Sequence, residues 1–237
     1  MVPISTGLTV PSIPYSLPIK KGYSTDILVA VAKSPIHHFL LTMTPFYNFV
    51  KEPVTFHFSE VASLFNQAWG ACHRQDYKAA LHFAQLGSDF FLNPQTSIEA
   101  KQEDLLVRIY FVYLRAICHC ALNDEEESIK DLSLIAFAAP SVSMQIWAIT
   151  LRNRFFLRSS SPDVDAVIFN SQLALEMAPD LFWESEIYFN LALALALIHK
   201  IDEGRPSFQK ARQISPFHPF LPLLAQIYDP PKMQQSH

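Results

Sequence analysis

Charged residues are scarce in this chain, and runs of basic residues are absent. Asp, Glu, Lys and Arg make up 17% of the 237 residues, below the roughly 25% of an ordinary soluble domain. Half of the residues are hydrophobic, and the formal net charge is −4. The basic surface that a nucleic-acid-binding protein needs is therefore not expected. A chain of this composition either buries most of its apolar surface or keeps some of it for a partner.

Cysteine is rare, and no stretch is apolar enough to span a membrane. The three cysteines, Cys72, Cys118 and Cys120, cannot all pair, and their spacing matches no disulfide framework. The N-terminal residues lack the basic start and apolar run of a secretory signal. The longest nearly uninterrupted apolar stretch, 187–198, has 12 residues, whereas about 18 are needed to cross a bilayer. We expect an intracellular protein, cytoplasmic or nuclear, without membrane insertion.

Motifs that carry catalysis are missing as well. The five glycines are scattered, so they cannot form a phosphate-binding loop, and no HExxH or Gly-x-Ser-x-Gly motif occurs. The most suggestive metal-binding cluster is Cys118-His119-Cys120. Neighbours one and two positions apart point in different directions on a helix, so we interpret these residues as part of a core. We predict no catalytic site, no metal and no cofactor.

Proline is unevenly distributed, and its positions outline a repeat. Seven of the 17 prolines lie within the first 53 residues, whereas residues 54–139 contain only Pro94. Proline is excluded from helix interiors, so long helices are expected after residue 54. Pro94, Pro140, Pro179 and Pro216 each follow an apolar stretch and are separated by 46, 39 and 37 residues. Periods of this size are typical of helical repeats.

Two helix pairs are clearest in the pattern. Residues 113–140 begin with an apolar helix, turn at Asn123, and continue with four acidic residues, 124–127, which favour a helix N-terminus. Residues 185–199 form the next clear apolar helix, followed by a turn and a second helix that ends before Pro216. Because Pro206 is tolerated only in a first turn, this second helix is expected to begin late or to kink.

Two further pairs complete the pattern. The first spans residues 58–73 and 77–91. The third pair begins with a helix at about 141–157, and its second helix is expected to have Ser161 as N-cap and Pro162 at the first helical position.

These residues resemble the tetratricopeptide repeat family, over roughly residues 61–216. That family has helix pairs of about 34 residues, with small residues where the two helices cross and a proline at the end. The closing segments LALEMAP and ARQISP match it. The small crossing residues would be Ala68 with Ala80, Ala116 with Ser128, and Ala192 with Gly204. The family's glycine at the turn within each pair is replaced by Gln75, Asn123, Pro162 and His199.

The resemblance implies an all-α fold, a right-handed solenoid of about four antiparallel helix pairs with a C-terminal capping helix. We expect three regions. Residues 1–55 are a Pro-rich extended segment with a short apolar element that packs on the first repeat. Residues 56–228 are the helical-repeat domain, and residues 229–237 are a flexible tail.

In proteins with this repeat, the first helices of successive pairs line a concave groove. A groove that is aromatic and weakly charged suits an apolar helix or an extended segment. The alternative is that Phe65, Trp69 and Tyr113 belong to the core. The partner-binding candidates are Phe65, Asn66, Trp69, His73, Tyr110, Tyr113, Ile117, Phe189, Asn190 and Leu193.

The resulting hypothesis is a non-catalytic scaffold or adaptor that binds another protein or a peptide segment. One alternative is a structural subunit of a larger complex, with its apolar surface permanently covered. An enzyme whose site follows no known motif is the third.

Overall fold

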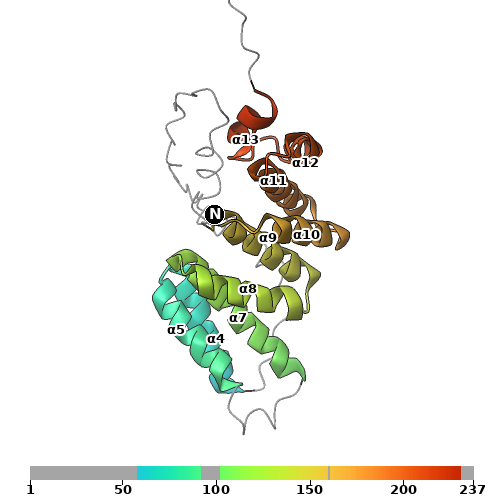
Figure 1. Cartoon of the computed structure of the whole chain (residues 1–237). Helices are drawn as coiled ribbons and strands as arrows, with labels where there is room; N and C mark the ends of the chain where they lie inside the picture. Colours follow the sequence, from blue (N-terminus) through green and yellow to red (C-terminus); the bar gives the residue numbers. More distant parts are fainter. Residues whose placement is uncertain (1–57, 92–101, 160, 231–237) are drawn as a thin grey trace, which may run out of the picture.

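The computed structural model describes residues 58–91, 102–159 and 161–230 of the chain (Figure 1). The regions 1–57 and 231–237, which include the expected N-terminal segment and most of the expected tail, lie outside the described residues. The described residues form nine helices and no strand. The helices are α4 (Ser59–His73), α5 (Tyr77–Phe90), α7 (Gln102–Leu122), α8 (Glu125–Ala138), α9 (Val142–Arg158), α10 (Val164–Glu176), α11 (Leu181–Leu197), α12 (Ile201–Ile214) and α13 (Leu221–Tyr228).

Aspartate side chains begin four of these helices. Asp76, Asp124, Asp163 and Asp180 each accept a hydrogen bond from a backbone N–H one turn into the helix that follows. Such a cap satisfies a donor that has no partner within the helix. In α8 the cap is followed by three glutamates in the first turn, so the prediction that the acidic run opens a helix is confirmed.

Two predicted boundaries are wrong. Asp163, and not Ser161, is the N-cap of α10, so Pro162 precedes the helix. Because Asp180 provides a cap, α11 begins four residues before the predicted residue 185. Helix α12 begins at Ile201 and includes Pro206 beyond its first turn, so it does not begin late, and the kink stays a prediction. Both Pro206 and Asp202, whose carbonyl loses its helical partner, are exposed, so water can replace the missing hydrogen bond.

The turns within three helix pairs use a left-handed backbone. Gln75, Asn123 and His199 have φ values of 61°, 58° and 60°. Glycine adopts this conformation without strain, whereas a residue with a Cβ does not. Proline cannot adopt it, and the connection that contains Pro162 has a different form. The tetratricopeptide repeat has glycine at four positions that match Gln75, Asn123, Pro162 and His199. At three of them this chain has the left-handed backbone that favours glycine.

The helices pack in the order of the sequence, each against the next one in the chain. The first helices of some neighbouring pairs also touch, α4 with α7 and α9 with α11. Figure 1 shows the sequence following the long axis of the molecule, from α4 and α5 at one end to α12 and α13 at the other. The fold is therefore all-helical, with packing between adjacent helices.

Small residues allow the paired helices to approach closely. All six predicted crossing residues are buried, and on α11 the atom nearest to Gly204 of α12 is the Cβ of Leu195. A Cβ added to Gly204 would lie 2.1 Å from the hydroxyl oxygen of Tyr228. That hydroxyl donates a hydrogen bond to the carbonyl of Ala192 at 2.6 Å. The missing side chain at Gly204 thus makes room for the contact that holds α13 on the last pair.

Ion pairs also attach the residue that follows α13 to α12. Asp229 lies 3.2 Å from Nη1 of Arg205 and 2.7 Å from Nη1 of Arg212. Asp229, which the sequence assigned to the flexible tail, is therefore attached to α12.

A matched pair of glycine substitutions tests this packing. A Cβ at Gly87 would lie 2.1 Å from the ring of Phe111, which is fully buried. We expect Gly87→Ala to lower the free energy of unfolding by about 1–3 kcal/mol. At Gly70 the nearest atom is the mobile end of Arg74, at 3.4 Å, so Gly70→Ala should be neutral or raise it by up to about 1 kcal/mol. Urea denaturation measures both, and equal effects would contradict this account.

Candidate functional site

Six of the ten predicted groove residues are buried. Tyr113, Phe189, Asn190 and Leu193 have no exposed surface, while Phe65 and Ile117 are 8% and 5% exposed. The Asn190 amide donates a hydrogen bond to the carbonyl of Thr150 at 3.2 Å. The expectation that these six side chains line an open groove is corrected: they belong to the core. The physical reason is that neighbouring helices cover α7, α9 and α11 on nearly every side, and that Phe65 on α4 packs on the Phe111 ring of α7.

The other four candidates lie at one end of the helix series. Asn66 and His73 on α4 are exposed, and Trp69 and Tyr110 are half-buried. The Trp69 ring meets the His73 ring edge-on, with centroids 4.4 Å apart. A role in partner binding stays a prediction for these four residues.

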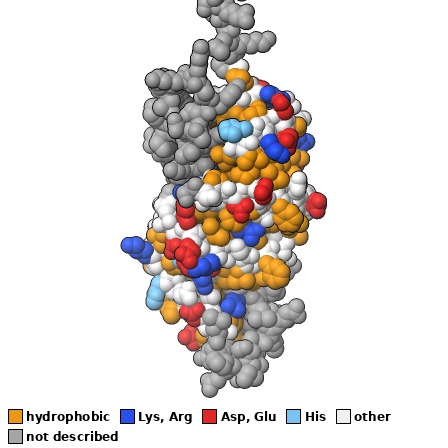
Figure 2. Space-filling model, in the orientation of Figure 1, with side chains coloured by type: hydrophobic (Ala, Val, Ile, Leu, Met, Phe, Trp, Pro, Cys, Tyr) orange, Lys and Arg blue, Asp and Glu red, His pale blue; other side chains and the backbone are white. Residues whose placement is uncertain are grey.

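The large apolar side chains that are most exposed in the middle of the molecule lie elsewhere. Phe137 on α8 is 88% exposed, Phe169 on α10 is 66% exposed, and Leu181 at the start of α11 is 69% exposed. Figure 2 shows hydrophobic side chains reaching the surface over the part of the molecule that α8, α9 and α10 form in Figure 1. We call this set the outer apolar surface: Leu134, Phe137, Val142, Phe169, Leu173, Leu181 and Phe182.

The spacing of apolar residues on α8 and α10 indicates this surface, although the predicted groove did not include them. Leu134 and Phe137 are three positions apart on α8, and Phe169 and Leu173 are four apart on α10. Residues at these spacings lie on the same side of a helix. On α8 the inward stripe is formed by other residues, Leu132 and Ile135, which are fully buried. Apolar residues outside the inward stripe therefore mark the surface.

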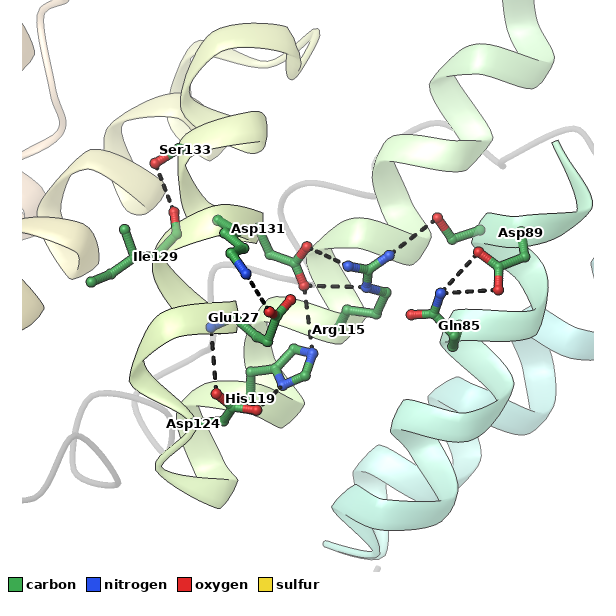
Figure 3. A network of polar contacts seen from close by, with 11 residues as sticks. Gln85, Asp89, Arg115, His119, Asp124, Glu127, Ile129, Asp131 and Ser133 are labelled. Atoms are coloured by element: carbon green, nitrogen blue, oxygen red, sulfur yellow. Dashed lines mark hydrogen bonds and ion pairs between the residues drawn. The ribbon is translucent and has the colours of Figure 1, made fainter. Parts of the chain in front are cut away.

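Polar side chains gather where α5, α7 and α8 meet (Figure 3). Arg115 binds both carboxylate oxygens of Asp131, with Nη2 2.7 Å from Oδ1 and Nε 3.2 Å from Oδ2. Its Nη1 also donates to the Ser88 hydroxyl on α5 at 3.5 Å. On the next turn of α7, the His119 ring lies between two carboxylates, 3.3 Å from Asp124 and 3.9 Å from Asp131. A single arginine thus joins three helices.

The Asp131 carboxyl titrates in an unusual range. Burial raises its pKa to about 6, although the charges of Arg115 and His119 and the hydrogen bond from Arg115 act in the opposite direction. Desolvation disfavours the ionised form of a carboxyl group, whereas a nearby cation favours it. The ion pair is therefore fully charged only above mildly acidic pH.

A second arginine repeats this arrangement one pair further along. Arg152 on α9 donates to the Ser133 hydroxyl on α8 at 3.2 Å and to Asn170 on α10 at 3.3 Å. Arg115 and Arg152 each join the second helix of their own pair to the second helix of the preceding pair. In both, a serine is the partner in the preceding pair. Asp131 is replaced by the neutral Asn170, so only the first bridge is an ion pair.

A buried cluster of Arg154, Glu186 and His218 joins α9, α11 and the segment before α13. Glu186 lies 3.3 Å from Nη2 of Arg154 and 2.7 Å from Nε2 of His218, and all three side chains are at most 6% exposed. The backbone N–H of Phe220 donates to Nδ1 of His218, so Nε2 carries the proton that is donated to Glu186. Arg154 also stacks on the Phe189 ring, 4.4 Å from its centroid.

Ionisation of Glu186 is favoured despite its burial. Burial raises the pKa of Glu186, but the hydrogen bond from His218, together with the charge and the hydrogen bond of Arg154, outweighs it and leaves the pKa below its ordinary value. Separating a buried pair leaves an isolated charge, which is strongly unfavourable. The cluster therefore specifies how the last helices dock.

Neither cluster provides an open reaction site. The three residues Cys118, His119 and Cys120 are buried and face different neighbours, because Cys118 packs on Ala71 and Ala80 whereas His119 faces α8. In the described part of the chain, no group of three or more His, Cys, Asp or Glu side chains is placed to hold a metal ion. Within the same part, no helix is both long and apolar enough to cross a membrane.

Comparisons with known proteins identify no relative. No protein-family model matches the chain, no curated protein matches it, and no solved structure matches its fold. The likeness to the tetratricopeptide family therefore stays a prediction from the residues quoted above.

Removal of the Glu186 charge tests the buried cluster. Glu186→Gln keeps the shape but leaves Arg154 without its carboxylate, and we expect the free energy of unfolding to fall by roughly 3 kcal/mol. The control is Glu203→Gln, which breaks an exposed pair with Lys200 at 3.1 Å and should change stability by less than about 1 kcal/mol. Chemical denaturation at neutral pH gives both values, and a loss no larger than the control's would contradict the assignment.

The raised pKa of Asp131 has a measurable consequence. The folded protein holds this proton up to about pH 6, compared with an ordinary value of 3.8, so the contribution of Asp131 to stability is largest below pH 4 and is lost as the pH rises to 6. We expect Asp131→Asn to make the slope of unfolding free energy against pH more positive than in wild type between pH 4 and 6. Above pH 7 the two curves should run parallel. Identical slopes over the lower range would exclude this titration.

Proposed function

We propose that this protein is a non-catalytic interaction scaffold or adaptor, which binds another protein or a peptide segment through the outer apolar surface. The observation that carries the proposal is the exposure of Phe137 and Phe169, 88% and 66%, on two helices that are otherwise well packed. Exposed groups of apolar side chains on a folded protein mark interaction sites. Large aromatic side chains are also typical energetic centres of interfaces.

The proposed architecture is a right-handed solenoid of about four antiparallel helix pairs, similar to the tetratricopeptide type. Three features support it: the packing of each helix on the next, the buried small residues at the crossings, and the left-handed turn residues. The equivalent bridges formed by Arg115 and Arg152 add a repeat at the level of hydrogen bonds. A series of such pairs presents residues from successive helices along a common surface.

The form of the surface favours an apolar partner segment. Its members come from α8, α9, α10 and α11, and they include three phenylalanines. An amphipathic helix that lays its apolar side on such a surface would bury these rings, while its polar side would meet the charged side chains that Figure 2 shows around them. Trp69 and Tyr110, which are half-buried at the far end, offer a second contact for the same class of partner.

The alternative is a structural subunit whose outer apolar surface is permanently covered in a larger complex. The low charge of the whole chain, 17% of residues, favours this alternative, because obligate interfaces are more apolar than transient ones. Size-exclusion chromatography with light scattering separates the two. A permanent subunit aggregates when expressed alone and is rescued by its partner, whereas an adaptor is a stable monomer at high concentration.

Substitution of two phenylalanines tests the proposed surface. Proximity labelling in cells identifies the partner, and its purified form is then titrated against wild type and against the variant Phe137→Ser/Phe169→Ser. We expect affinity to fall at least tenfold, equivalent to about 1.4 kcal/mol. The control is Phe217→Ser, because Phe217 is 96% exposed but lies outside this surface. If a folded double variant binds every partner as tightly as wild type does, the outer apolar surface is not the binding site.

A further inference from the structure

Two of the three cysteines meet where the first two helix pairs touch. Cys72 lies near the end of α4, and Cys118 lies near the end of α7. Cys118 forms a small cluster with Ala71 and Ala80, Cys72 packs against this cluster, and each of the two thiols shifts the pKa of the other. Cys118 is fully buried, whereas Cys72 is partly exposed. Of the two residues, therefore, only Cys72 has surface that is exposed to solvent.

The close approach follows from the residues around the pair. Ala71 and Ala80 have almost no exposed surface, and their small side chains let α7 come near the crossing of α4 and α5. Tyr77 closes one side of the cluster, and charge on either sulfur raises the pKa of the Tyr77 hydroxyl, to which burial also contributes. The environment is compact and held by three helices, so the two sulfurs stay adjacent in the folded protein.

The two thiols are not equivalent. The hydrogen bond from Cys118 lowers the pKa of Cys72, and the same bond, together with burial, raises the pKa of Cys118. A thiolate is the reactive form of cysteine, so Cys72 is the sulfur that reacts first. Cys120, two positions along α7, packs in the main core instead, where burial raises its pKa to about 12.

We propose that Cys72 and Cys118 are a peroxide-sensitive pair that forms a reversible disulfide between α4 and α7. The Cys72 thiolate attacks hydrogen peroxide, breaking the O–O bond; the sulfur becomes a sulfenic acid, and the released hydroxide takes a proton to give water. The Cys118 sulfur then attacks the Cys72 sulfur, and its proton leaves with the displaced hydroxide as a second water. Two thiols are oxidised, and one peroxide is reduced to two waters.

The disulfide would join the first helix pair covalently to the second. It closes a loop that contains all of α5, and a closed loop limits the freedom of the unfolded chain. In a reducing compartment such a bond forms only transiently. It would act as an oxidation-dependent clamp on the first pair, independent of the outer apolar surface, which begins at α8.

Mass spectrometry of the purified full chain tests this proposal. Reduced wild type and the single variants Cys72→Ser, Cys118→Ser and Cys120→Ser are treated with hydrogen peroxide, and remaining thiols are blocked with N-ethylmaleimide. Before blocking, wild type and Cys120→Ser should each lose about 2 Da, and after digestion both should yield one cross-linked peptide pair containing Cys72 and Cys118, reversed by dithiothreitol. Cys72→Ser and Cys118→Ser should yield none. In Cys118→Ser, dimedone should trap the sulfenic acid on Cys72.

A measurement on wild type alone covers the case in which a variant fails to fold. Under native conditions, Cys72 should react with iodoacetamide at least about tenfold faster than Cys118 or Cys120. A cross-link that includes Cys120, a disulfide only between molecules, peroxidation of Cys72 to sulfinic acid without a cross-link, or faster labelling of Cys118 would each overturn the proposal.

Discussion

The structure depends on burial around the whole circumference of α7, α9 and α11. Their described side chains are buried on nearly every side, so none of these helices is stable with only one neighbour in contact. Each one needs its own second helix, the second helix of the preceding pair, and in places the preceding first helix. This requirement explains why the pairs pack in sequence order, and why small residues are needed at the crossings, where any larger side chain would hold two backbones apart.

Polar groups buried between these helices have to be paired. The pairing fixes the position of one helix along the next, which apolar contacts alone do not. Arg115 on α7 and Arg152 on α9 each bind acceptors on the helices at both sides of their own. The hydrophobic contacts alone would tolerate a sliding of one helix along another. A fork-shaped guanidinium with fixed acceptors does not tolerate it. The cluster of Arg154, Glu186 and His218 has the same role for the last helices, where the chain changes from paired helices to the short α13.

Local chemistry made most of the fold predictable. The proline spacing, the acidic first turn of α8 and the apolar periodicity indicated the helices. The turn positions at Gln75, Asn123 and His199 were found by matching them to the glycine of the tetratricopeptide repeat. The errors occurred where two local signals competed, as with Ser161 and Asp163 as alternative caps. The exposure of the predicted groove residues could not be predicted in the same way. Whether Tyr113 or Phe189 is exposed depends on what packs on the other side of its helix, and spacing along one helix carries no information about that.

The left-handed turn residues have a consequence for how this molecule can deform. A residue with a Cβ occupies a narrow left-handed basin, whereas glycine at the same place moves freely among several. Gln75, Asn123 and His199 therefore stiffen the turns of three helix pairs. Deformation under load changes the packing between neighbouring pairs before it changes these turns, and the bridges of Arg115 and Arg152 are the contacts that resist it.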